Sequence, residues 1–231
     1  MRLATFNIKH GEISGLGAIA EALRAVDADV VGLQEVDRGV RRSGGGDQAR
    51  LLGEQLGMAW AFGRAMDLEG GAYGCALLVK PALTSGSKIA RPLPAESLAL
   101  PGGGAPGEEP RVLLWARVGA LRIFVSHLDL PAATRVAQAE AIAAAMGEAR
   151  LCILLCDGNE SVQGPAVARL LSLPLRDSWT EAGAPERPTA PLDRPQERID
   201  HVLLGAGAGP ARAARAIDTA ASDHPLVVVD L

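Results

Sequence analysis

Apolar runs that end abruptly on acidic, amide or imidazole side chains recur along this chain of 231 residues. In residues 154–162, LLCDGNESV, a fully apolar run stops at Asp157, Gly158 and Asn159. The same pattern places further polar residues in or beside apolar segments: Asn7, Glu35, His127, Asp200, Asp223 and His224. Taken singly, each has a plain interpretation as a turn or capping residue. Because buried polar groups are costly unless they are paired or bind a metal, a fold that gathers them into one site explains the whole set better.

The apolar periodicity predicts alternating strands and helices. Strands are expected at residues 2–8, 29–36, 72–79, 111–118, 122–130, 151–156, 198–205 and 225–231, and helices at 15–26, 47–56, 132–149 and 164–172. Asp47 is the expected N-cap of the second helix, and the Gly119–Ala120 turn is typical of an antiparallel hairpin. The pattern indicates a mixed α/β fold with antiparallel pairs rather than a strict βαβ repeat.

Two Pro- and Gly-rich stretches, residues 100–110 and 183–197, are expected to be loops. The first has the composition of a domain linker. Polar strand ends of the same kind lie on both sides of it, which favours one site built by both halves of the chain. We therefore expect a single domain spanning residues 1–231.

Composition restricts the class of protein. Hydrophobic residues make up 48% and charged residues 22%, as in ordinary globular proteins, and the formal net charge of -4 gives no global field to attract a polyanion. The N-terminus alternates like a strand rather than resembling a signal peptide, and no apolar run approaches the roughly 20 residues needed to span a bilayer. None of the three cysteines has a second cysteine at the spacing typical of a metal site or a redox motif. They are therefore interpreted as apolar strand residues of a protein in a reducing compartment. A cytoplasmic monomer without a transmembrane segment is expected.

The polar strand ends favour metal-assisted chemistry when they are considered together. Carboxylate and amide oxygens are hard ligands that suit Mg²⁺ or Mn²⁺, and His127 and His224 can carry protons or stabilise charge. No nucleophilic serine or cysteine motif is evident, so direct attack by water is favoured over a covalent intermediate.

The order of these motifs resembles that of the endonuclease/exonuclease/phosphatase superfamily, which includes DNase I-like nucleases and inositol-polyphosphate and sphingomyelin phosphodiesterases. The matching segments are, in order, TFNI, LQEVD, YGCALL, SHLD, CDGN, RIDHVL and SDHPLV. They extend along nearly the whole chain. The resemblance implies a four-layer α/β sandwich, with two mixed sheets packed face to face, helices outside and the site at one end of the sheets.

The resemblance also implies a metal site. Glu35 would be the principal ligand of a Mg²⁺ ion, with Asn7 and Asp223 assisting at the metal. In-line attack on phosphorus builds negative charge on the phosphoryl and leaving oxygens, and a divalent cation stabilises that charge.

Further residues would act on water and phosphate. By the same resemblance, Asp157 would orient or deprotonate the attacking water, and Asn159 would hold the water or the phosphate. His224, oriented by Asp200, would stabilise the pentacovalent transition state. His127 would donate to a phosphoryl oxygen or aid the leaving group.

Weaker candidates flank these motifs. Tyr73 matches a residue that contacts phosphate in some relatives, and Arg111 begins a strand where many relatives carry a basic residue; strand packing explains each equally well. His10 is better explained as a solvated loop residue, and strand alternation points His201 away from the site. The one compact basic cluster of the first half comprises Arg38, Arg41 and Arg42. A solvated loop is favoured for that cluster over a phosphate grip.

The sequence departs from the family pattern around the catalytic aspartate. Cys156 and Gly158 stand where the family usually has Gly and Phe, and Cys75 stands where Asn is common. Loss of the aromatic side chain at position 158 is expected to change local packing and to remove a wall that could contact substrate.

These observations favour a Mg²⁺-dependent phosphodiesterase or phosphatase that acts on small or lipid-linked phosphates. A nuclease acting on DNA or RNA is the first alternative, although such an enzyme is expected to carry more Lys and Arg around its cleft. The second alternative is an inactive module that binds a phosphorylated ligand. Retention of the complete metal and histidine set disfavours it.

Overall fold

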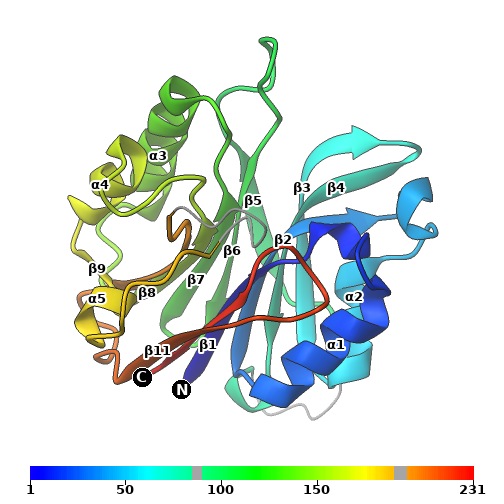
Figure 1. Cartoon of the computed structure of the whole chain (residues 1–231), viewed down its shortest axis with the longest axis horizontal. Helices are drawn as coiled ribbons and strands as arrows, with labels where there is room; N and C mark the ends of the chain where they lie inside the picture. Colours follow the sequence, from blue (N-terminus) through cyan, green and yellow to red (C-terminus); the bar gives the residue numbers. More distant parts are fainter. Residues whose placement is uncertain (85–89, 190–196) are drawn as a thin grey trace.

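Two mixed six-stranded β-sheets pack face to face in the computed structural model, which describes residues 1–84, 90–189 and 197–231 (Figure 1). The first sheet, in the order β11-β12-β1-β2-β4-β3, contains β1 (Arg2–Asn7), β2 (Val30–Arg38), β3 (Ala59–Leu68), β4 (Gly71–Val79), β11 (Ala213–Ile217) and β12 (Leu226–Asp230). The second, in the order β5-β6-β7-β8-β10-β9, contains β5 (Ala95–Ala99), β6 (Val112–Val118), β7 (Leu121–His127), β8 (Cys152–Asp157), β9 (Leu175–Asp177) and β10 (Asp200–Gly205).

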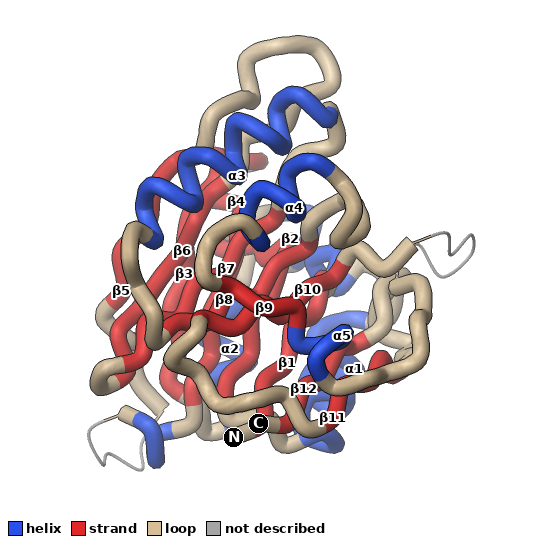
Figure 2. The backbone as a smooth tube through the Cα atoms, turned by 90° about the vertical axis from the view of Figure 1, so that its left-hand side faces the viewer, coloured by secondary structure: helices blue, strands red, loops and turns tan. Residues whose placement is uncertain are grey.

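Helices cover the outer face of each sheet. They are α1 (Gly15–Val26), α2 (Gln48–Leu56), α3 (Ala132–Met146) and α4 (Pro165–Leu171). The short helix α5 (Ser178–Glu181) instead packs Trp179 into the cluster between the sheets, and the 3₁₀ turns are η1 (Lys9–Gly11), η2 (Arg41–Ser43) and η3 (Pro81–Leu83). Helices α3 and α4 lie together over the second sheet (Figure 2). Their side chains pack on that sheet, and those of α1 and α2 pack on the first. The expected four-layer α/β sandwich is confirmed.

The central strands are apolar on both faces because each sheet is covered on both sides. Leu3, Leu77, Leu114 and Leu155 belong to the buried cluster between the two sheets. A Cβ atom at Gly32 in β2 would lie 2.6 Å from Cβ of Leu155 in β8, so the sheets approach too closely there for any side chain. The three cysteines are buried and free, as their apolar contexts indicated: Cys75, Cys152 and Cys156.

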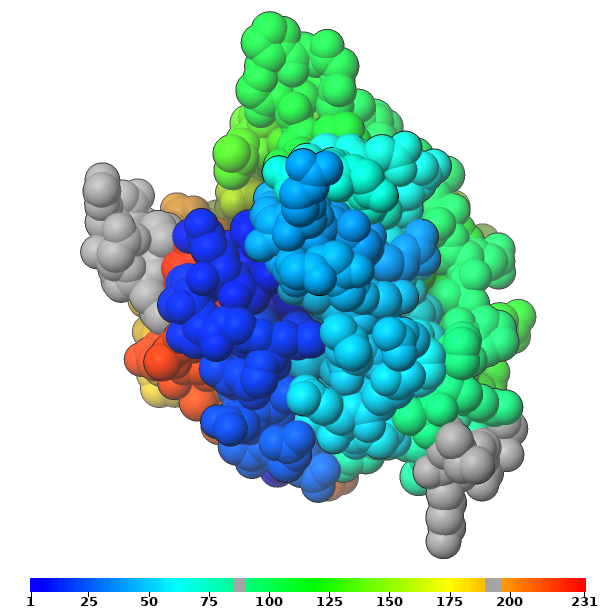
Figure 3. Space-filling view, turned by 90° about the vertical axis from the view of Figure 1, so that its right-hand side faces the viewer, coloured from blue at the N-terminus to red at the C-terminus, as the bar shows by residue number. Residues whose placement is uncertain are grey.

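Most expected elements are present, with shifted ends. Asp47 caps α2, since its side chain accepts a hydrogen bond from the backbone N–H of Arg50. The loop at residues 100–110 joins β5 and β6, which are neighbours in one sheet, and it projects at the top of Figure 3 (green). Of the second predicted loop, residues 190–196 lie outside the described part of the chain. No helix within the described ranges combines the length and apolar character needed to cross a membrane.

Strand direction brings the polar residues to one end of the sandwich, opposite the two termini (Figure 1). β1 and β2 run parallel, as do β7 and β8, so their C-terminal ends meet at the same edge. β10 is antiparallel to β8, which sets its first residue, Asp200, directly opposite Asp157. β12 is antiparallel to β1, so the segment that leads into it, including His224, lies at the same end.

Candidate active site

The side chain of Asn7 joins carboxylates from the two sheets. Its amide nitrogen donates to Oε1 of Glu35 in β2 at 2.8 Å and to Oδ2 of Asp157 in β8 at 3.0 Å. Its amide oxygen accepts the backbone N–H of Lys9 at 3.0 Å, which fixes the orientation of the group. Asn7 therefore places two carboxylates within a few ångströms of each other, and it presents nitrogen rather than oxygen to them.

Glu35 reaches this position through an irregularity in β2. The pairing of β2 with β4 shifts between Leu33 and Val36, and Glu35 has a left-handed backbone with φ of 55°. Such bulges re-aim a side chain, and a non-glycine residue in this conformation is strained. Burial, together with the charge of Asp157, raises the pKa of Glu35. A cation bound at these carboxylates would relieve that cost.

Asp157 and Asn159 are held by a tight turn at the end of β8. Oδ1 of Asp157 accepts the backbone N–H of Asn159 at 3.1 Å. Asn159 has φ of 49°, a conformation that Asn tolerates better than most residues. Its side-chain nitrogen donates to the carbonyl of Leu128 at 2.7 Å, so the amide is anchored to the segment that follows His127.

His127 is a buried, neutral imidazole whose tautomer is set by Arg111. Nη1 of Arg111 lies 3.0 Å from Nδ1 of His127, and because a guanidinium only donates, Nδ1 accepts. The ring proton of the neutral form is then on Nε2, which lies 3.0 Å from the side-chain nitrogen of Asn159 and 3.4 Å from Oδ2 of Asp157. Because an amide nitrogen does not accept hydrogen bonds, Asp157 is the acceptor that Nε2–H faces. Burial and the neighbouring charge of Arg111 lower the pKa of His127 to about 3. His127 thus offers an N–H donor without carrying a charge.

His224 has the opposite protonation state. Its Nδ1 lies 3.0 Å from Oδ2 of Asp200, and its Nε2 lies 3.8 Å from Oδ2 of Asp157. Burial opposes the charged form, but the charge and hydrogen bond of Asp200 outweigh it and raise the pKa of His224 to about 10. Ser222 steadies this turn, since its hydroxyl donates to the carbonyl of Asn7 at 2.6 Å. His224 is therefore an imidazolium aimed at the same carboxylate as His127.

Arg111 and Tyr73 flank His127. Arg111 is almost fully buried, and its Nη1 lies 2.8 Å from Oε1 of Glu109. Tyr73, Arg111 and His127 line one small cavity beside the site. Burial raises the pKa of the Tyr73 hydroxyl, so it acts as a neutral group. Both residues lie near the imidazole, while their contact with a substrate stays a prediction.

Asp223 differs from the other expected residues. Its Oδ2 accepts from Nζ of Lys9 at 3.0 Å, so it is engaged in an ion pair at the edge of the site. The role of Asp223 at a metal stays a prediction.

The donor set fits a hard divalent cation. Asp157, Asp200 and His224 have potential ligand atoms within 4.8 Å of one another. An imidazolium cannot ligate a metal, however, because both of its nitrogens carry protons. Glu35, a largely buried carboxylate that Asn7 holds beside Asp157, is the better place for Mg²⁺ or Mn²⁺, both of which prefer oxygen ligands.

His10 and Arg42 lie closer to the site than the sequence indicated. Nδ1 of His10 lies 3.9 Å from Oε2 of Glu35, with its side chain only 15% exposed. Arg42 forms a two-pronged ion pair with Asp37 at 2.9 Å for each contact, and its guanidinium lies over the ring of Tyr73. His10 is more buried than the solvated loop residue that the sequence favoured, whereas Arg38, Arg41 and Arg42 are exposed, as a solvated loop requires. The position of His10, three residues after Asn7, was the available signal.

The structure also corrects the interpretation of Gly158. A Cβ atom at this position would lie 3.0 Å from Cδ2 of His201 and 3.1 Å from Cγ2 of Val167. The missing aromatic side chain would therefore point into the packing beneath α4. His201 itself points away from the site, as strand alternation predicted, and its Nε2 lies 2.8 Å from the carbonyl of Glu160.

Residues 4–224 match the model of the Endonuclease/Exonuclease/phosphatase family, so the chain belongs to this family. An endonuclease/exonuclease/phosphatase family protein from Bacteroides thetaiotaomicron has 20% identity and a TM-score of 0.75, covering 100% of this chain and 98% of that chain. A mannosyl-6-phosphatase from the same organism has 18% identity and a TM-score of 0.72, covering 100% of this chain and 98% of that chain. The catalytic domain of human nocturnin, solved with bound sulfate, has 17% identity and a TM-score of 0.71, covering 100% of this chain and 92% of that chain. No curated protein is similar enough to count as a match.

Proposed function

We propose that the chain is a Mg²⁺-dependent phosphoester hydrolase in which water attacks phosphorus in line, without a covalent intermediate. The observation that carries this proposal is the pair of imidazoles with opposite protonation around one carboxylate. His127 and His224 both face Asp157, one as a neutral donor and the other as a cation. In-line attack by water moves a proton and builds negative charge on the phosphoryl oxygens in the same step. A neutral hydrogen-bond donor and a cation beside the carboxylate that accepts the proton suit this reaction.

Each residue has a part in this reaction. Asp157 orients the attacking water and accepts its proton, while Asn159 positions the water or the phosphate. The imidazolium of His224, held by Asp200, stabilises negative charge on the phosphoryl oxygens, and the neutral ring of His127 donates a hydrogen bond from Nε2–H to a phosphoryl or leaving-group oxygen. Bound Mg²⁺ would supply further neutralisation of that charge.

Glu35 is the proposed principal metal ligand. Asn7 orients its carboxylate through a hydrogen bond of 2.8 Å, and Asp223 assists from the edge of the site. Mn²⁺ is expected to substitute for Mg²⁺, because both cations bind carboxylate oxygen.

A small phosphorylated molecule is the favoured substrate class. Three cations near the site are each paired with a carboxylate: Lys9 with Asp223 at 3.0 Å, Arg42 with Asp37 at 2.9 Å and Arg111 with Glu109 at 2.8 Å. Contacts to the backbone of a long nucleic acid require unneutralised Lys and Arg. The mannosyl-6-phosphatase among the structural neighbours is consistent with a small phosphoester.

Two variants and an isotope label test the proposal. Asp157→Ala and His224→Ala are each expected to lower the rate of bis(p-nitrophenyl) phosphate hydrolysis by roughly 10²-fold or more. With a phosphodiester made chiral at phosphorus by oxygen isotopes, a single in-line attack by water should invert the configuration of the product. Full activity in both variants would overturn the assignment of residues, and retention of configuration would overturn direct attack by water.

A further inference from the structure

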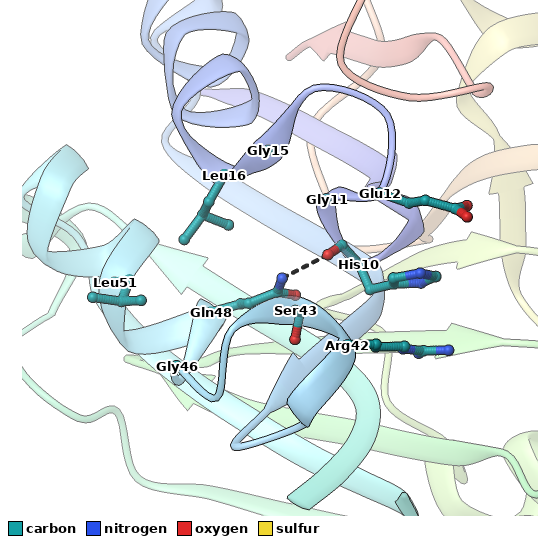
Figure 4. Close-up of a pocket in the computed structure, with 10 residues that line it drawn as sticks. All are labelled: His10, Gly11, Glu12, Gly15, Leu16, Arg42, Ser43, Gly46, Gln48 and Leu51. Carbon is teal, nitrogen blue, oxygen red and sulfur yellow. Dashed lines mark hydrogen bonds between the residues drawn. The ribbon is translucent and has the colours of Figure 1, made fainter. Parts of the chain in front are cut away.

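A pocket beside Glu35 is not used by the chemistry described above. It lies between η1, η2 and the ends of α1 and α2, has a volume of about 590 Å³ and is lined by polar and apolar side chains (Figure 4). We call it the His10 pocket and define it by His10, Glu12, Leu16, Arg42, Ser43 and Gln48. Because Nδ1 of His10 lies 3.9 Å from Oε2 of Glu35, the pocket adjoins the proposed metal site.

The wall of the His10 pocket is held in a strained conformation. Lys9 and His10 are consecutive non-glycine residues with φ of 44° and 43°. Gln48, which is buried, donates to the carbonyl of His10 at 2.7 Å (Figure 4) and accepts the backbone N–H of Asp37 at 2.9 Å. This clamp ties η1 to β2. Strain of this kind persists only where surrounding contacts impose it, and it clusters at functional sites.

Two polar groups at the pocket lack partners among the described residues. Nδ1 of His10 is buried without a hydrogen bond, although buried polar atoms are nearly always paired. Nε and Nη2 of Arg42 are taken by Asp37, which leaves Nη1 as a donor. In Figure 4 the side chains of His10, Arg42 and Glu12 extend in the same direction, away from the side of the pocket on which Leu16 and Leu51 lie. They form a row of hydrogen-bonding groups that a ligand could satisfy.

The charge of this row excludes a second phosphate. Asp37 offsets the charge of Arg42 through two contacts of 2.9 Å, and Lys9 offsets that of Glu12, since its Nζ lies 3.6 Å from Oε2 of Glu12. An anion would therefore meet no net positive field, whereas hydroxyl groups can both donate to carboxylates and accept from a guanidinium. The size of the pocket is that of a small-molecule site.

On the basis of the proposed function, we infer that the His10 pocket binds the uncharged, hydroxyl-bearing part of the substrate. The substrate class is then the phosphate ester of a polyol such as a sugar. The hydroxyl groups of this part contact His10, Arg42 and Glu12, while its phosphate lies at the metal site. Discrimination arises because substrates without hydroxyl groups leave Nδ1 of His10 and Nη1 of Arg42 without partners.

Substrate ratios test this inference. The ratio of kcat/KM for mannose 6-phosphate to that for p-nitrophenyl phosphate should fall by roughly tenfold or more when Ser43→Phe fills the pocket or His10→Gln alters its wall. Arg50→Ala is the control, because Arg50 lies on α2, is paired with Glu54 and does not line the pocket. Its ratio should stay within about twofold of the wild-type ratio. Equal ratios in all four proteins would overturn the inference, as would faster hydrolysis of a DNA oligonucleotide than of mannose 6-phosphate.

A binding measurement separates this inference from the proposed function. Calorimetry with mannose 6-phosphate and Mg²⁺ on Asp157→Asn, which is expected to be inactive, should show binding that is lost when Ser43→Phe is added. Circular dichroism on both proteins establishes that each is folded. If neither substrate is hydrolysed by the wild-type protein but the pocket-dependent binding is observed, the proposed function fails and the ligand class stands. Binding of mannose 6-phosphate that is unchanged by Ser43→Phe would overturn the assignment of the binding site to the His10 pocket.

Discussion

Arg111 controls the properties of His127 more than any other side chain does. It fixes Nδ1 as an acceptor at 3.0 Å, and its charge adds to the effect of burial in lowering the pKa of His127. Arg111→Gln removes that charge, so the pKa of His127 should rise. The acidic limb of the pH profile of kcat/KM should then move to higher pH, and the rate should fall by up to roughly 10²-fold.

Arg117 provides the matched control for this prediction. It lies on β6, the strand that follows Arg111, but its side chain is exposed. Arg117→Gln should leave the pH profile unchanged. An acidic limb at the same pH in the wild-type protein and in Arg111→Gln would contradict the proposed effect of Arg111 on the pKa of His127.

His201 is expected to make the protein sensitive to acid. Burial and the charge of Arg198 lower its pKa to about 4, so the folded protein binds fewer protons than the unfolded chain between about pH 6.5 and pH 4. Stability contributed by the neutral ring is therefore complete above the unfolded pKa and falls as the pH decreases through this window. His201 should contribute on the order of 2–3 kcal/mol to the loss of stability between pH 7 and pH 4.5, so urea unfolding should show a smaller loss in His201→Gln than in the wild-type protein. An equal loss in the two proteins would refute this role.

The sequence predicted which residues gather at the site better than it predicted their local geometry. The polar strand ends met because strand direction and register bring them to one edge, and both follow from the apolar pattern. The left-handed backbone of Glu35 and the ion pair of Lys9 with Asp223 depend on contacts between distant segments. The inward direction of a side chain at position 158 likewise depends on His201, which is 43 residues away in the sequence.

At the scale of elements, the strands that were missed share weak sequence signals. β5 is exposed along its whole length at an edge of the second sheet, and β11 consists largely of Ala and Arg. β9 has three residues, and β3 alternates with small residues that give little apolar periodicity. The site did not depend on these strands, because its residues come from the central strands and their adjoining turns.

The packing beneath α4 allows a test at this scale. Gly158→Ala should destabilise the protein by about 1–3 kcal/mol, because the new methyl group would meet His201 and Val167 at 3.0 and 3.1 Å. Gly17→Ala, the same change within α1, should instead stabilise it by up to about 1 kcal/mol, since nothing lies within 4 Å of that position. Urea unfolding at pH 7 measures both. A Gly158→Ala variant as stable as the wild-type protein would show that the side chain at position 158 points elsewhere.

At the scale of the whole molecule, the two sheets contribute different parts of one site. The first sheet supplies Asn7 and Glu35, and the second supplies His127 and Asp157. A cation bound between them should resist separation of the sheets and stabilise the fold. Mg²⁺ at 100 times its Kd is expected to stabilise the protein by about 2.7 kcal/mol. Glu35→Gln should lose most of this gain in a thermal unfolding experiment, and an equal gain in both proteins would place the cation elsewhere.

The dependence of hydrolysis on Mg²⁺ tests the central claim most directly. Initial rates with bis(p-nitrophenyl) phosphate should be abolished by EDTA, return when Mg²⁺ is added and saturate as its concentration rises. Glu35→Gln should need a higher Mg²⁺ concentration to reach half of its maximal rate, because it lacks the principal metal ligand. Hydrolysis that continues unchanged in EDTA, or a Mg²⁺ dependence that is identical in the wild-type protein and Glu35→Gln, would contradict the account.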